Sequence, residues 1–134
     1  MQTVTLPVVS AITAGALIIG QMGLLLTTAL RRRATRQSLG EGDPSLQRVV
    51  RRHGNYAENA AIFVASLALL EMMGAERLFI LGLAALFILG RLLHAVGLSL
   101  QNTVNVWRIA GVTASVAACV TLGVRLVTLG IAQL

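Results

Sequence analysis

Long apolar runs separated by short polar stretches dominate this chain. The first run, residues 4–30, contains no charged residue, and about 20 apolar residues in a helix suffice to cross a bilayer. Polar or glycine-containing stretches follow it at 37–45, 74–76 and 101–105, where turns are expected. The pattern predicts helices over about residues 4–30, 45–73, 77–100 and 106–129.

Composition places these helices in a membrane. The chain has 134 residues, of which 56% are hydrophobic and 12% charged, and its mean hydropathy is +0.81. A soluble domain of this size exposes much of its area and needs more polar surface. We therefore expect an all-α, integral membrane four-helix bundle that forms a single domain over 1–134, with no separate soluble domain.

The ends of the first two helices carry specific signals. The first segment lacks a positively charged start and is longer than a signal-peptide core, so we expect a retained helix. It is expected to end at Arg31, where a run of arginines begins. Asp43, Pro44 or Ser45 suits the start of the second helix, with a proline in its first turn.

All eleven basic residues are arginines, and the formal net charge is +6. Because they are interspersed with apolar sequence, membrane topology explains them better than nucleic-acid binding. Four of them follow the first helix: Arg31, Arg32, Arg33 and Arg36. The positive-inside rule therefore predicts that the first and third connections are cytoplasmic and both termini lie outside.

Several arginines fall at membrane depth, where each costs about 2.5–3.5 kcal/mol and therefore faces protein or a wet cavity. At 100° per residue, Arg48, Arg51, Asn55 and Glu58 form one stripe, with Arg52 and Asn59 on its flank. This stripe is either an ion-pair network that stabilises the bundle or a small functional site. Positive charge exceeds negative here, which favours an anionic ligand.

The third and fourth helices add to this level. Arg91 and His94 share a face because they are three residues apart, and Arg108 begins the fourth helix near the same side. Guanidinium groups with one carboxylate describe a pocket for a small zwitterionic, multiply anionic ligand. The two histidines, without a cysteine cluster, do not predict a metal site. So small a bundle cannot hide every arginine, which predicts a homo-oligomer.

Residues 48–59, R-V-V-R-R-H-G-N-Y-A-E-N, resemble the second-helix signature R-x-x-R-x-H/Q-x-N-x-x-E of the MAPEG family, the membrane-associated proteins in eicosanoid and glutathione metabolism. The resemblance extends to the length, the four helices, the basic first loop and the arginines of the third and fourth helices. It implies a homotrimer that binds glutathione as co-substrate between subunits, near the cytoplasmic side. It is closest to the compact bacterial branch, which implies a bacterial inner membrane.

The resemblance also implies individual roles. Arg108 is the catalytic candidate, because it matches the arginine that stabilises the glutathione thiolate, and Glu58 would bind the glutathione ammonium. Two positions depart from the family pattern, since His94 replaces a third-helix tyrosine and Leu98 another tyrosine of eukaryotic members. The residues implied to bind or support glutathione are Arg51, Asn55, Glu58, Arg48, Arg91, His94, Arg31 and His53.

The leading hypothesis is a glutathione-dependent transferase or peroxidase that detoxifies lipophilic electrophiles. The first alternative is a non-catalytic scaffold of the same fold that binds lipids or other ligands. The second is a small multidrug exporter, which needs a membrane-embedded carboxylate, typically in the first helix. That helix has no carboxylate, and arginines repel cationic drugs, so the exporter is disfavoured.

Overall fold

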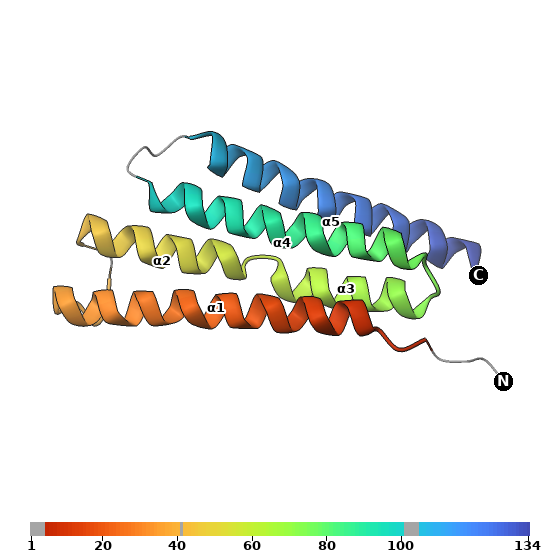
Figure 1. Cartoon of the computed structure of the whole chain (residues 1–134), viewed down its shortest axis with the longest axis horizontal. Coiled ribbons are helices and arrows are strands. Elements are labelled where there is room, and N and C mark those ends of the chain that lie inside the picture. Colours follow the sequence, from red (N-terminus) through yellow and green to blue (C-terminus); the bar gives the residue numbers. More distant parts are fainter. Residues whose placement is uncertain (1–4, 41, 101–104) are drawn as a thin grey trace.

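The computed structural model describes residues 5–40, 42–100 and 105–134. The helices are α1 (Val8–Thr35), α2 (Pro44–Ala57), α3 (Ala60–Met72), α4 (Arg77–Ser99) and α5 (Val106–Ala132). In Figure 1, α2 and α3 follow one another beside α1, so five helices form four rods. The prediction of an all-α four-helix bundle is confirmed. The expected turn at 101–105, except Asn105, and the expected start of the first helix at residue 4 lie outside the described residues.

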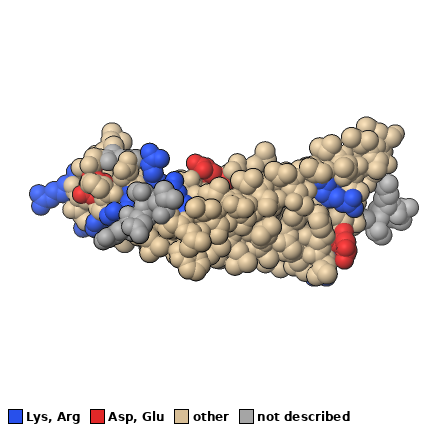
Figure 2. Space-filling view, turned by 90° about the horizontal axis from the view of Figure 1, so that it is seen from above, with Lys and Arg blue, Asp and Glu red and all other residues tan. Residues whose placement is uncertain are grey.

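The rods run up and down, as short connections require. The α1–α2 connection, the end of α4 and the start of α5 lie at one end of the bundle, and the start of α1 and the C-terminus lie at the other (Figure 1). On the face drawn in Figure 2, arginines gather at the first of these ends, and the surface between the two ends is largely uncharged. We call this the arginine end. Helices α1, α4 and α5 are long and apolar enough to cross a membrane.

The interior is packed around two stacked phenylalanines. The rings of Phe63 on α3 and Phe87 on α4 lie nearly parallel, with centroids 3.9 Å apart. Helices α4 and α5 can approach closely because Gly97 has no side chain. A Cβ at this position would lie 2.6 Å from the backbone nitrogen of Arg108. Gly111 and Ser115 of α5 likewise lie against α4, whereas Gly123 has open space around it. The small residues of α5 thus serve packing within the chain over its first half.

The prediction of one continuous helix over 45–73 is wrong, because the helix is interrupted between α2 and α3. Glu58 leaves the helical conformation at ψ 131°, and Asn59 adopts a left-handed conformation at φ 62°, which asparagine tolerates better than most residues. The helix restarts at once, since the Phe63 N–H donates to the Asn59 carbonyl at 2.8 Å. Asp43 and Pro44 begin α2 as expected, as N-cap and first helical residue.

The first helix also extends further than expected. It continues through Arg31–Arg33 to Thr35. The C-cap Arg36 adopts a left-handed conformation, which lets the N–H of Gln37 donate to the Arg32 carbonyl at 3.1 Å. Arginine is a good helix former, so a change from apolar to charged residues marks the edge of the hydrocarbon rather than the end of the helix.

At the opposite end, the side chain of Glu71 on α3 caps the N-terminus of α1. Its carboxylate accepts hydrogen bonds from the Val9 and Ser10 N–H groups, both at 2.9 Å, and from the Ser10 hydroxyl at 2.7 Å. A helix N-terminus has unsatisfied N–H groups and is the positive end of the helix dipole, so a carboxylate there is stabilising. The carboxylate of α3 therefore fixes the position of α1 in the bundle.

Candidate functional site

Three of the expected ligand residues form a polar stripe on α2. Arg51 and Glu58 are exposed and Asn55 is half-buried, with its side-chain amide donating to the Arg51 carbonyl at 2.8 Å. The opposite face of α2 is buried through Leu46 and Tyr56. The stripe (Arg51, Asn55 and Glu58, the α2 stripe) therefore points away from the interior of its own bundle, where a ligand or a second subunit has access.

Arg91, also expected to bind the ligand, lies inside the bundle. It is only 6% exposed, and its Nε donates to the Ser115 hydroxyl at 3.0 Å. Its terminal nitrogen donates to the carbonyl of Asn55 at 2.7 Å and more weakly to that of Glu58 at 3.4 Å. The break after α2 frees these carbonyls from helical bonding. Arg91 thus supplies hydrogen bonds to the free carbonyls at the end of α2 and stabilises the interruption between α2 and α3.

His94 lies near this arginine, and Arg108 lies near His94. His94 is 7% exposed and interacts electrostatically with Arg91, Arg108 and Glu58. Neither of its ring nitrogens has a hydrogen-bond partner among the described residues. Arg108 lies in the first turn of α5, where its N–H donates to the Asn105 side chain at 3.0 Å. The fold therefore brings together expected site residues from α2, α4 and α5.

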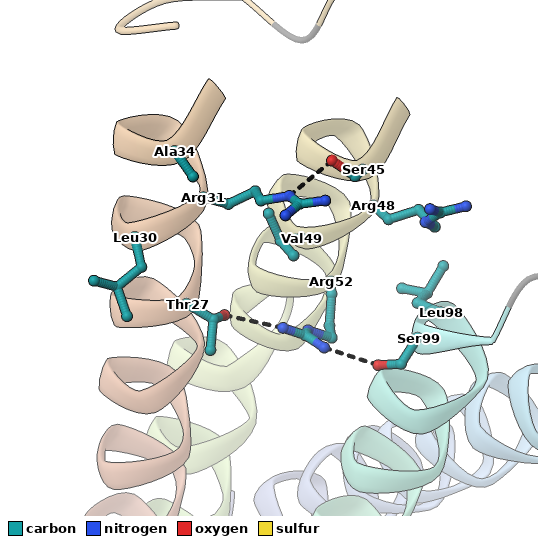
Figure 3. Close-up of a pocket in the computed structure, with 10 residues that line it drawn as sticks. All are labelled: Thr27, Leu30, Arg31, Ala34, Ser45, Arg48, Val49, Arg52, Leu98 and Ser99. Atoms are coloured by element: carbon teal, nitrogen blue, oxygen red, sulfur yellow. Dashed lines mark hydrogen bonds between the residues drawn. The ribbon is translucent and has the colours of Figure 1, made fainter. Parts of the chain in front are cut away.

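Arg31 and Arg48 occupy a different place. They line a pocket of about 530 Å³ between α1, α2 and the end of α4 (Figure 3). Arg52, which the sequence placed only on the flank of the stripe, lies in the same pocket. We call it the arginine pocket, and its lining residues are Thr27, Leu30, Arg31, Ala34, Ser45, Arg48, Val49, Arg52, Leu98 and Ser99.

His53 also points away from the α2 stripe. Its Nε2 lies 2.6 Å from the side-chain nitrogen of Gln21 on α1, and the residue is half-buried. In this chain His53 therefore joins α2 to α1 rather than facing the same side as Arg51.

At the edge of the arginine pocket, hydrogen bonds link Asp43, Ser45 and Arg31. Asp43, the N-cap of α2, accepts from the Ser45 hydroxyl and from the N–H groups of Ser45 and Leu46. The hydroxyl hydrogen bond, followed by that of the Leu46 N–H, holds the pKa of Asp43 below its usual value, and Arg31 adds a smaller attraction. Ser45 in turn accepts from Arg31 Nε at 2.7 Å.

Sequence reasoning missed Arg52 as the centre of a pocket. Its guanidinium joins the Ser99 hydroxyl of α4 and the Thr27 hydroxyl of α1, both at 2.9 Å. These partners are 47 and 25 residues away in the chain. Helical periodicity reports the face of one helix and carries no signal for which neighbours meet it.

The sequence model of the MAPEG family matches residues 10–128. The chain belongs to the MAPEG family. The resemblance seen in the second helix is therefore confirmed across almost the whole chain, and with it an integral membrane protein of a glutathione-associated family. A search of curated proteins finds no match to the chain.

Proposed function

We propose that this MAPEG protein is a glutathione-dependent transferase, with peroxidase activity as a variant of the same chemistry, acting on lipophilic electrophiles. The observation that carries the proposal is the exposed α2 stripe, where Arg51 and Glu58 offer one cation and one anion on the same face. Glutathione has carboxylates, an ammonium and a thiol, so it needs groups of both signs. Arg51 and Asn55 would bind a carboxylate, and Glu58 the ammonium.

Catalysis would use Arg108. A guanidinium near the glutathione sulfur favours the thiolate, because an opposite charge stabilises the ionised form. In conjugation, the thiol proton leaves to solvent, the sulfur forms a bond to the electrophilic carbon, and the leaving group departs with the electron pair of its bond. In the peroxidase reaction, the thiolate attacks a hydroperoxide oxygen, the O–O bond breaks to release an alcohol, and a second glutathione displaces water from the sulfenic acid to give glutathione disulfide. The membrane would deliver the electrophile to the α2 stripe, and Arg91 and His94 would support the site from within the bundle.

A homotrimer would complete the site. The α2 stripe faces out of its own bundle, so a neighbouring subunit is needed to enclose the ligand. Arg31, Arg48 and His53, which the resemblance implies as further glutathione ligands, do not lie on the α2 stripe, and the proposed site does not depend on them. The positive-inside rule places the arginine end in the cytoplasm. Both termini would then lie on the opposite, non-cytoplasmic side of a bacterial inner membrane.

The test is a glutathione titration of the purified full-length protein, followed by thiolate absorbance in the ultraviolet. We expect a saturable signal that Arg108→Gln strongly reduces at equal glutathione occupancy. Arg125→Gln, at the other end of α5, is the control and should keep the signal. Absence of a signal in the unmodified protein would exclude the enzyme; saturable binding of a lipophilic ligand without turnover would then support the scaffold alternative.

A further inference from the structure

The described residues that line the arginine pocket include a positive centre and no matching anion. Arg52 makes its two hydrogen bonds to neutral hydroxyls, those of Ser99 and Thr27. Its Nε is buried and has no partner among the described residues. A buried donor without a partner is costly, and a cation in a partly apolar pocket attracts a counter-ion.

Arg52 is also held in place. Each hydroxyl that accepts from it donates to a carbonyl of its own helix: Thr27 to Leu24 at 2.7 Å and Ser99 to Ala95 at 2.8 Å. The hydroxyls are thereby oriented to accept from the guanidinium. This arrangement fixes Arg52 between α1 and α4 before any ligand arrives, which lowers the entropy cost of binding.

Two further guanidiniums face the same space. Arg31 is anchored through Nε to Ser45, and Arg48 projects from α2 above Leu98 (Figure 3). The described residues that line the pocket include no carboxylate. Among the described residues Asp43 is a nearby acid, and it accepts a hydrogen bond from the Ser45 hydroxyl. Three like charges around one pocket repel one another, and an anion between them relieves the repulsion.

The walls of the pocket identify the kind of anion. Leu30, Ala34, Val49 and Leu98 line it beside the arginines, so polar and apolar contacts are offered together. Leu30 ends the uncharged run of α1, and Arg31 begins the charged one. The pocket therefore lies where hydrocarbon gives way to headgroups. Basic pockets between membrane helices at that depth suit anionic lipid headgroups.

We propose that the arginine pocket binds the phosphate of an anionic glycerophospholipid, with Arg52 as its central ligand and Arg31 and Arg48 at its rim. The acyl chains would leave along the apolar wall. This site lies between α1, α2 and α4, whereas the α2 stripe faces out of the bundle, so it is separate from the proposed glutathione site. A bound lipid would join three helices at the arginine end.

Native mass spectrometry of the full-length protein in mild detergent tests the proposal, by titration with phosphatidylglycerol. We expect saturable binding that Arg52→Gln weakens about tenfold or more, the loss expected for one charge-assisted hydrogen bond. Arg33→Gln is the matched control: it removes the same charge at the same end but does not line the pocket, and its affinity should change less than about twofold. Equal binding by Arg52→Gln and the unmodified protein would overturn the proposal.

Two further ligands identify the source of the phosphate, and two further variants protect the test. Phosphatidylcholine with the same acyl chains should bind more weakly; equal binding would overturn the need for an anionic headgroup. Inorganic phosphate competing as well as the lipid would overturn the lipid assignment. If Arg52→Gln does not fold, Arg48→Gln replaces it and should also weaken binding. Arg51→Gln should keep lipid binding whether or not it binds glutathione, so the two proposals fail separately.

Discussion

Arg91 on α4 and Arg51 on α2 carry the same charge but occupy opposite environments. Arg91 is 6% exposed and makes hydrogen bonds to Ser115 and to the end of α2, and its guanidinium lies 5.3 Å from the centre of the Phe87 ring. Arg51 is exposed on the outward face of α2. The comparison shows that an arginine at membrane depth can be a structural part of the bundle or can stay exposed on its outer face, where we propose that it binds a ligand.

The largest expected effect comes from replacing Arg91. Arg91→Met fills similar space but leaves two partly buried carbonyls and the buried Ser115 hydroxyl without this donor. Because a buried group that loses its partner costs about 1–3 kcal/mol, we expect a loss of about 3 kcal/mol in the free energy of unfolding. Thermal unfolding in detergent measures it, with Arg77→Met at the far end of the bundle as control. A variant with normal stability that fails only to bind glutathione would make Arg91 a ligand residue instead.

Replacing Arg51 should have the opposite signature. We expect Arg51→Gln to weaken glutathione binding about ten- to a hundredfold, since a hydrogen bond to a charged group contributes about 1.5–3 kcal/mol. The unfolding temperature should stay close to that of the unmodified protein, because no core contact is lost. Isothermal titration calorimetry in detergent gives the affinity, and Arg33→Gln is the control. If Arg51→Gln lowers stability and leaves affinity unchanged, the α2 stripe is structural.

Glu58 allows a sharper test because its backbone and side chain have different roles. Its carbonyl accepts from Arg91 at 3.4 Å, and Glu58→Gln keeps that carbonyl. We expect the variant to keep its stability and to lose about tenfold in glutathione affinity, from one charged hydrogen bond to the ammonium. Glutathione lacking its amino group should bind both proteins equally. A tenfold difference with that analogue as well would mean that Glu58 does not bind the ammonium.

The smallest effect is expected at the break itself. Asn59 has φ 62°, a conformation that costs a residue with a Cβ about 1–2 kcal/mol. Asparagine tolerates it through its short polar side chain, so Asn59→Ala should destabilise the protein by about 1 kcal/mol, whereas Asn59→Gly should be close to neutral. Thermal unfolding of both variants decides the point. Equal destabilisation by alanine and glycine would show that the asparagine side chain, not the backbone conformation, stabilises the break.

Much of the site could be predicted because it depends on local spacing. Arg51, Asn55 and Glu58 share a face through the helical period alone, and α2 is helical across the first two and ends at Glu58. The role of Arg91 could not be predicted. The carbonyls that it bonds are 36 and 33 residues away, and they are free only because the chain breaks after Ala57.

The sequence by itself determined the class of the protein. The lengths of the apolar runs predicted four membrane helices, the positions of the arginines predicted which end is basic, and the spaced motif at 48–58 indicated the family. Tertiary structure alone decided how the arginines divide between the interior, the arginine pocket and the outward α2 stripe. The physical reason is that hydrophobic periodicity is a property of one helix, whereas a guanidinium takes its role from donors and acceptors on the helices packed against it. Arg91, Arg52 and Arg51 look alike in the sequence and differ only in those neighbours.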